Sequence, residues 1–356
     1  MSITTRTFDR NAEGQTVTQY ILKNAQGAEA KIIDFGATLT SLTVPDNNGD
    51  LADVVLGFDD MAGYLKSHGH MGETIGRYGN RIAKGQITLE GVDYQLACNN
   101  GENHLHGGNV GFGVRMWSAT PMEGKGQDSV KFHLVSPDGE ENYPGTLTVD
   151  VTYTWNDRCD LIIRYEATCD KTTLCNLTNH SYFNLAGHDH GTIDDQDLFI
   201  DADVITAVDD GLIPTGAYTP VAGTPFDMRE VSNLGDGLAC AEECPEMVDT
   251  QGFDHNYVLR KGSAMGLCAV AYDDLSGRMM EVITDQPAMQ LYTANTTNIS
   301  GGKGGAHYGP HSAFCLETQH CPDTPHHSQF GTTELHPGEK YDTTTIYAFR
   351  LEDDEE

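Results

Sequence analysis

Apolar and polar residues alternate along much of this chain, which is the pattern of β-strands that bury one face. Residues 147–155 carry an apolar side chain at every second position, and residues 161–167 repeat the alternation. Asn156 and Asp157, between the two runs, are residues typical of turns. We therefore predict a hairpin of two long, half-buried strands over 147–167.

Further strands are predicted by the same alternation. Residues 87–89 and 92–96 flank a Glu90-Gly91 turn, residues 130–134 and 344–350 alternate as well, and residues 39–44 continue a β pattern before Pro45. A helical pattern is scarce, and only residues 59–67 suit a short helix. We expect an all-β protein, a large antiparallel β-sandwich, with one domain over residues 1–350 and an acidic tail over 351–356.

Composition and charge narrow the class of protein. The 356 residues include 21 Lys and Arg against 53 Asp and Glu, a formal net charge of −32. A field of that sign repels phosphate backbones, so we expect no nucleic-acid partner. No apolar run approaches the roughly 18–20 residues that cross a bilayer, so we expect no membrane association. The first residues lack the apolar segment of a signal peptide, which indicates the cytoplasm.

The nine cysteines are scattered, odd in number and never spaced as CxxC. This spacing argues against a disulfide framework and against a structural zinc site. We interpret them as mostly reduced, buried thiols.

Candidate chemistry lies in a few polar stretches. Arg77 and Arg81 stand four apart among glycines and suit a bidentate grip on hydroxyl or carboxylate groups, although one of them could instead pair with a surplus carboxylate. In an extended segment His104 and His106 share a face, and the pair could contact a ligand or hold a metal.

Two further stretches offer acid–base groups. In a strand Asn176, Thr178 and His180 would share a face, and histidine is the natural proton carrier near neutral pH. Glu317 stands among apolar neighbours, where a carboxyl group tends to have a raised pKa and can serve as a base. The alternative for Glu317 is a charge at a strand edge.

Taken in order, these motifs resemble the aldose 1-epimerase (galactose mutarotase) family. The resemblance rests on GRYGNRIAKGQITLEGVDYQL, NHLHGG, NHSYFNLAG, FDHNYVL, QLYTAN and CLETQHCPD, and it covers nearly the whole chain. It implies a sandwich of the galactose-mutarotase type with a sugar cleft on one sheet. It also implies interconversion of the α and β anomers of free hexoses, without a metal or organic cofactor, by a monomer whose partner is a small sugar.

The resemblance also implies roles for individual residues. His180 matches the family's general acid and Glu317 its general base. The residues that match sugar-binding positions are Asn80, Arg81, His106, Asp254 and Gln290. The chain departs from the family pattern at His70-Met71-Gly72-Glu73, which replaces a more aromatic stretch, and in the glycine-rich run before His307.

Three other functions remain as alternatives. A hexose-6-phosphate 1-epimerase would need a basic phosphate pocket, which the net charge disfavours. A non-catalytic sugar-binding protein would need neither His180 nor Glu317 as an acid–base pair. A glycosidase ordinarily uses two carboxylates, whereas this pair is a histidine and a glutamate. The sequence does not choose between galactose and glucose.

Overall fold

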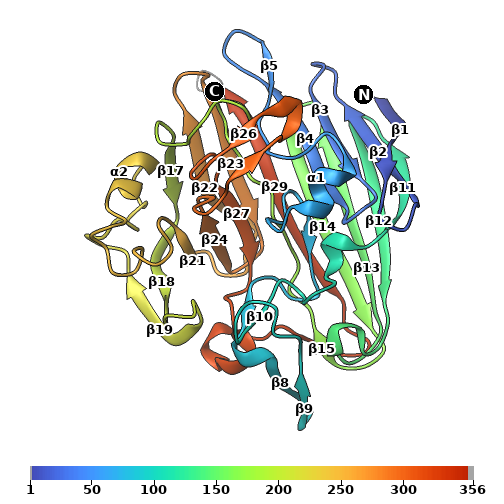
Figure 1. Ribbon diagram of the computed structural model, residues 1–356, viewed down its shortest axis with the longest axis vertical. Helices are drawn as coiled ribbons and strands as arrows, with labels where there is room; N and C mark the ends of the chain where they lie inside the picture. Colours follow the sequence, from blue (N-terminus) through green and yellow to red (C-terminus); the bar gives the residue numbers. More distant parts are fainter. Residues whose placement is uncertain (1, 352–356) are drawn as a thin grey trace.

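The computed structural model describes residues 2–351, and antiparallel strands dominate it (Figure 1). The largest sheet has nine strands. In spatial order they are β11 (Ser118–Glu123), β12 (Gln127–Ser136), β13 (Leu147–Asn156), β14 (Asp160–Cys169), β29 (Tyr341–Leu351), β23 (Arg278–Thr284), β22 (Gly266–Asp273), β17 (Asp197–Ile200) and β20 (Ser232–Asn233).

Two five-stranded sheets form the other principal layer. The first consists of β1 (Ser2–Arg10), β2 (Thr16–Lys23), β3 (Glu29–Ile33), β4 (Thr38–Pro45) and β5 (Leu51–Asp53). The second consists of β19 (Pro214–Pro220), β18 (Ala202–Val208), β21 (Asp254–Leu259), β24 (Ala288–Tyr292) and β27 (Cys315–Gln319).

The core lies between the nine-stranded sheet and these two sheets. The rings of Tyr20 on β2 and Phe132 on β12 meet edge to face at 5.7 Å. On the other side, the Tyr347 hydroxyl of β29 donates to the Leu316 carbonyl of β27 at 2.9 Å. The architecture is the predicted antiparallel β-sandwich, and that prediction is confirmed.

The hairpin predicted over 147–167 is confirmed as β13 and β14. The register pairs Val151 with Tyr165 and Tyr153 with Ile163, and all four side chains are buried. Period-two alternation located this hairpin because only one face of each strand meets the core. The hairpin around Glu90-Gly91 is also confirmed, as β8 (Gln86–Leu89) and β9 (Val92–Gln95).

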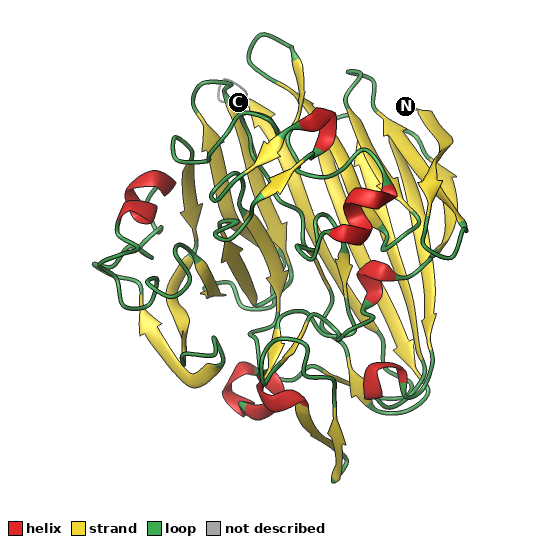
Figure 2. Ribbon diagram, viewed as in Figure 1, coloured by secondary structure: helices red, strands yellow, loops and turns green. Residues whose placement is uncertain are grey.

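Helices are few and short, and they lie outside the sheets (Figure 2). The predicted helix is confirmed as α1 (Met61–Lys66), where the Asp60 side chain caps the Gly63 N–H. A second helix, α2 (Leu234–Ala239), was not predicted, since its sequence LGDGLA is too short and glycine-rich to show a helical period. The 3₁₀ turns are Ala83–Gly85, Phe112–Val114, Glu140–Asn142, Lys303–Gly305, Thr324–His326 and Ser328–Phe330. No helix within residues 2–351 is long and apolar enough to span a membrane.

The last strand, β29, occupies the middle of the nine-stranded sheet, between β14 and β23. It covers the run over 344–350 where the sequence predicted a strand. Leu351, predicted to open the acidic tail, is the last residue of β29, and residues 352–356 of that tail lie outside the described part of the chain.

Within the described residues 2–351, five short strand pairs complete the fold, and two of them position the site. These two are β6 (Thr74–Ile75) with β16 (Thr178–Asn179), and β7 (Arg81–Ile82) with β10 (His104–Leu105). The remaining short strands are β8 and β9, β15 (Thr173–Leu174) with β28 (Glu334–Leu335), and β25 (Ile299–Ser300) with β26 (His307–Tyr308).

Candidate active site

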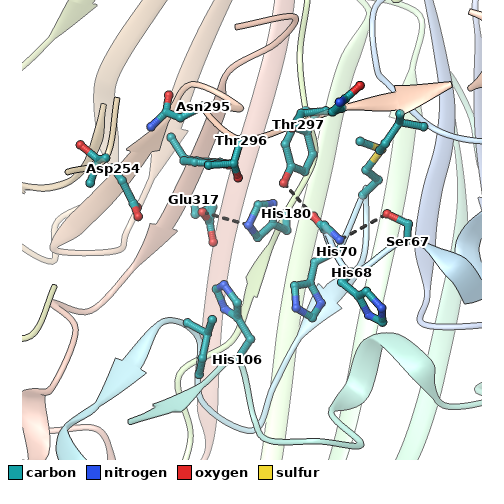
Figure 3. A pocket seen from close by; sticks show the side chains of 18 of the residues that line it. Ser67, His68, His70, His106, His180, Asp254, Asn295, Thr296, Thr297 and Glu317 are labelled. Carbon is teal, nitrogen blue, oxygen red and sulfur yellow. Dashed lines mark hydrogen bonds and ion pairs between the residues drawn. The ribbon is translucent and has the colours of Figure 1, made fainter. Parts of the chain in front are cut away.

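A cleft of about 690 Å³ opens between strands β21 and β27 and the short strand pairs. It collects most of the residues that the sequence singled out, although they are far apart in the chain (Figure 3). Those that line it are Asn80, Arg81, His106, His180, Asp254 and Glu317.

Strands β21, β24 and β27 supply one wall of the cleft. Asp254 opens β21 and Glu317 lies in β27, with β24 between them. The register pairs Asp254 with Tyr292 and Gln290 with Glu317, so alternate positions on three adjacent strands direct polar side chains to one face.

A left-handed backbone at two positions shapes the opposite wall. Asn80 has φ +66° and His106 has φ +51°, and asparagine is among the few side chains that tolerate this region. The two residues exchange hydrogen bonds: the Asn80 N–H donates to His106 Nδ1 at 3.1 Å, and the His106 N–H donates to the Asn80 carbonyl at 3.1 Å. Because Nδ1 accepts, the ring proton of neutral His106 lies on Nε2, so His106 is a hydrogen-bond donor with a fixed tautomer.

His180 and Glu317 meet in the middle of the cleft. His180 Nε2 lies 3.5 Å from Glu317 Oε1, and both residues are buried (Figure 3). The other ring nitrogen, Nδ1, lies 3.5 Å from Cys315 Sγ, which fixes the ring from behind. Glu317 Oε2 is buried and has no hydrogen-bond partner among the described residues. Such an unsatisfied carboxylate oxygen is costly and is typical of a functional site.

Burial sets the protonation of this pair. It raises the pKa of Glu317 well above the ordinary value, and the negative charge of Asp254 adds to the shift while Arg81 opposes it. Burial also lowers the pKa of His180 to about 3, with a contribution from the charge of His70. The pair therefore favours one carboxylic acid and one neutral imidazole, which together carry the same number of protons as a carboxylate and an imidazolium.

Arg81 and Asp254 carry the opposite charges of the cleft. Arg81 Nη2 lies 3.5 Å from Asp254 Oδ2, and both side chains are mostly but not fully buried. This distance leaves each group able to turn a hydrogen bond toward a bound molecule.

The donor set fits a metal poorly. His106, His180 and Glu317 each bring one ligating atom within 4.8 Å of the others. However, the lone pair of His106 Nδ1 accepts from the Asn80 N–H, and Nε2 carries the ring proton. Neutral His106 thus has no free lone pair for a metal, and the arrangement suits hydrogen bonding to an organic ligand instead.

Comparison with known proteins agrees with this geometry. The family model described as aldose 1-epimerase matches residues 18–348. The chain belongs to the aldose 1-epimerase family. Among its relatives, galactose mutarotase from Bos taurus is 44% identical, with 94% of this chain and 95% of that protein covered. Aldose 1-epimerase from Escherichia coli (strain K12) is 33% identical, with 96% of this chain and 97% of that protein covered.

Solved structures of the family have the same fold. A GalM/aldose epimerase homologue from C. elegans superposes with a TM-score of 0.85 at 35% identity, covering 93% of this chain and 98% of that chain. The galactose 1-epimerase from Lactobacillus acidophilus NCFM gives a TM-score of 0.86 at 27% identity and covers 99% of both chains. The match to the aldose 1-epimerase model spans every residue of the cleft named above.

Gln290 takes a different place from the other site residues that the aldose 1-epimerase resemblance implied. It is buried and does not line the cleft, and its Nε2 donates to Asp254 Oδ1 at 2.6 Å. It is therefore placed to orient the Asp254 carboxylate from behind.

The two arginines of the GRYGNR motif also separate. Arg77 is 2% exposed and donates to the Ser136 hydroxyl and to carbonyl groups including that of Gly145. It is a structural residue, and Arg81 alone of the two reaches the cleft. Spacing could not separate them, because their roles depend on which loop covers each side chain.

Several residues that line the cleft were not among the site residues predicted from the sequence. Tyr182 stacks on His180 with ring centroids 5.0 Å apart, and its hydroxyl donates to the Gly69 carbonyl at 2.7 Å. His70 reaches the cleft from the turn before β6, and Thr296 and Thr297 lie at its rim (Figure 3). The position of Tyr182, two residues after His180, was an available signal, but the loop residues carry no periodic pattern.

Proposed function

We propose that this chain is an aldose 1-epimerase that interconverts the α and β anomers of free hexoses, with D-galactose and D-glucose as substrates. The observation that carries the proposal is the convergence of His180 and Glu317, 3.5 Å apart, in the centre of a cleft with hydrogen-bonding walls. A hemiacetal opens when one proton leaves the C1 hydroxyl and another reaches the ring oxygen, so a base and an acid are needed together.

In the proposed mechanism Glu317 takes the proton of the C1 hydroxyl while the His180 imidazolium protonates the ring oxygen. The C1–ring oxygen bond breaks, and the sugar becomes an open-chain aldehyde. The pair is then a carboxylic acid and a neutral imidazole, the form that burial favours. Ring opening thus moves the two protons in the direction that the protein environment supports.

Reclosure reverses both transfers. Rotation about the C1–C2 bond presents the other face of the aldehyde to the hydroxyl that formed the ring. His180 takes the proton of that hydroxyl, and Glu317 returns its proton to the carbonyl oxygen. The reaction moves two protons and no electrons, so the two side chains suffice for the chemistry.

The remaining residues are proposed to bind and orient the sugar. His106 donates from Nε2, Arg81 and Asn80 offer further donors, and Asp254 accepts from sugar hydroxyls. Gln290 is proposed to act on the sugar through Asp254, to which it donates a hydrogen bond.

Polarimetry tests this function. Freshly dissolved α-D-galactose and α-D-glucose should reach their usual final rotation faster with the enzyme, and the Glu317→Gln variant should lose the effect. Acceleration only with a 6-phosphorylated hexose would favour a hexose-6-phosphate 1-epimerase. Sugar binding without acceleration would favour a non-catalytic sugar-binding protein.

We also propose a monomeric, cytoplasmic protein with one domain over residues 1–350. The cleft is completed by residues of one chain, and one hydrophobic cluster draws residues from Tyr20 to Phe349. Light scattering at micromolar concentration tests the monomer, limited proteolysis the single domain, and cell fractionation the location.

A further inference from the structure

His70 and Glu73 form a second ionisable pair in the wall of the cleft, and the proposed proton transfers do not use it. His70 Nδ1 lies 2.8 Å from Glu73 Oε2. Glu73 is 6% exposed, whereas the His70 side chain is 33% exposed and lines the cleft. A buried carboxylate needs a positive partner, and His70 is the group that the structure gives it.

The turn that carries this pair is fastened directly to His180. The Gly72 N–H donates to the His180 carbonyl at 2.9 Å, and the His180 N–H donates to the Glu73 carbonyl at 3.0 Å. Glu73 also packs closely against Gly113, where a Cβ atom would lie 2.0 Å from Oε2. These contacts fix the carboxylate, and through it the ring of His70, relative to the reacting histidine.

The backbone of His70 is itself held in an uncommon conformation. Its φ is +55°, in the left-handed region that few residues other than glycine occupy, although histidine tolerates it better than most. Such conformations persist where surrounding structure enforces them, and they concentrate at functional sites.

The His70 ring faces the two histidines of the site. Its centroid lies 5.1 Å from that of His106 and 6.1 Å from that of His180. Figure 3 shows Glu317 on one side of His180 and His70 on the other. A charge on His70 therefore acts on both histidine rings of the site.

We propose that the His70–Glu73 pair holds a positive charge beside His180 and thereby makes the His180 imidazolium a stronger acid toward the ring oxygen. His70 is a positioning residue in this scheme, because its charge acts through His180. The inference rests on the proposed anomer interconversion. A positive charge next to His180 disfavours a second positive charge there, so the proton moves more readily to the sugar.

The directions in which the histidine pKa values are shifted agree with this proposal. Burial opposes the charge of His70, but the hydrogen bond and the charge of Glu73 together raise its pKa above the ordinary value. The charge of His70 in turn contributes to the lowered pKa values of His106 and His180, after burial. Arg81 acts on His106 in the same direction.

Replacement of His70 tests the proposal. His70→Asn removes the charge and keeps a residue that tolerates the left-handed backbone. Unit charges about 6 Å apart at an effective dielectric constant of about 20 shift a pKa by about 2 units, and Glu73 is present in both proteins. We expect both limbs of the kcat/KM profile for α-D-galactose, measured from pH 3 to 9, to move upward by up to about two pH units.

Two further variants separate charge from structure. Glu73→Gln keeps the side-chain shape but removes the anion that holds His70 charged, so we expect a smaller shift in the same direction. His68→Asn alters a histidine two residues away that also lines the cleft, and we expect the two limbs to stay in place. If His70→Asn fails to fold, the pH profile of Glu73→Gln tests the proposal by itself.

An NMR titration of the histidine side chains provides a readout independent of activity. His70 in the wild type should titrate above about pH 6.5, the ordinary histidine pKa, and lower in Glu73→Gln. A His70 that titrates below this value, or an unmoved profile in both variants of the pair, overturns the inference. A wild type that does not accelerate mutarotation overturns the proposed function and the inference with it, whereas an active wild type with unmoved limbs overturns the inference alone.

Discussion

Replacing Glu317 by glutamine should slow the enzyme and stabilise its fold. The substitution keeps the shape of the side chain and removes both the negative charge and the ability to take a proton. The opposite effects share one cause, since the site buries a carboxyl group and thereby raises its pKa.

The size of each effect follows from the structure. Loss of one positioned base lowers kcat by about 10²–10⁴-fold, which is about 2.7–5.5 kcal/mol in the barrier. Glutamine leaves a polar atom at the unpartnered Oε2 position, so the gain in the free energy of unfolding comes from removing the ionisation and is about 1.36 kcal/mol for each pH unit above the ordinary pKa. A protein of this size should then melt a few degrees higher.

The stability gain should depend on pH in a defined direction. The pKa of Glu317 is raised in the folded state above the ordinary value of 4.5. Below that pH both states are protonated and the carboxyl group costs nothing. As the pH rises, the unfolded chain releases its proton while the folded protein keeps it, so the wild type loses about 1.36 kcal/mol per pH unit from this group. The advantage of glutamine therefore grows from about pH 4.5 up to the folded-state pKa.

Polarimetry with α-D-galactose measures kcat, and thermal unfolding at pH 5, 6, 7 and 8 measures stability. Glu123→Gln, an exposed position on the edge strand β11, is the matched control and should change neither quantity. Wild-type kcat in Glu317→Gln would refute its role as the base. An unchanged or lower melting temperature at pH 8 would refute the reasoning about burial.

Three further outcomes follow from the geometry. His180→Asn should lower kcat by about 10²–10⁴-fold with little change in KM, because the acid is used in the transition state; steady-state polarimetry measures both. Gln290→Met should instead raise KM about tenfold and leave kcat nearly unchanged, because Asp254 loses a hydrogen bond worth about 1.5–3 kcal/mol. A fall in kcat of about tenfold with an unchanged KM would contradict this. The free energy of unfolding should fall as the pH drops below about 6.5. Once the unfolded chain binds the proton, each histidine that burial keeps neutral lowers this free energy by about 1.4 kcal/mol per pH unit. Urea unfolding between pH 7.5 and 5.5 measures the slope. The buried histidines with lowered pKa are His104, His106, His180 and His255.

The strands were predictable because one face of each meets the core. Val151 and Tyr153 alternate with polar residues, and this period alone is enough to predict β13. Sheet order was beyond the sequence, because pairing of β14 with β29 joins segments about 180 residues apart and leaves no local signal.

The site was predictable where motif residues face the cleft, as His180 and Glu317 do. It was not predictable where the role of a residue depends on the loops and turns that pack against its side chain. Arg77 and Arg81 are alike in sequence, and only the loops that bury Arg77 distinguish them. His70 and Glu73 stood out only as a departure from the family pattern, since their pairing depends on a turn with a left-handed residue.

The central place of β29 has a consequence for how the protein is made. Until this eleven-residue strand leaves the ribosome, β14 and β23 each present an open edge to solvent, and the nine-stranded sheet is two separate halves. The core of the sandwich therefore closes only after residues 341–351 have been synthesised and released. Loss of β29, by an early stop codon or by proteolysis of the nascent chain, removes the piece that joins the halves and exposes edges that pair with other chains.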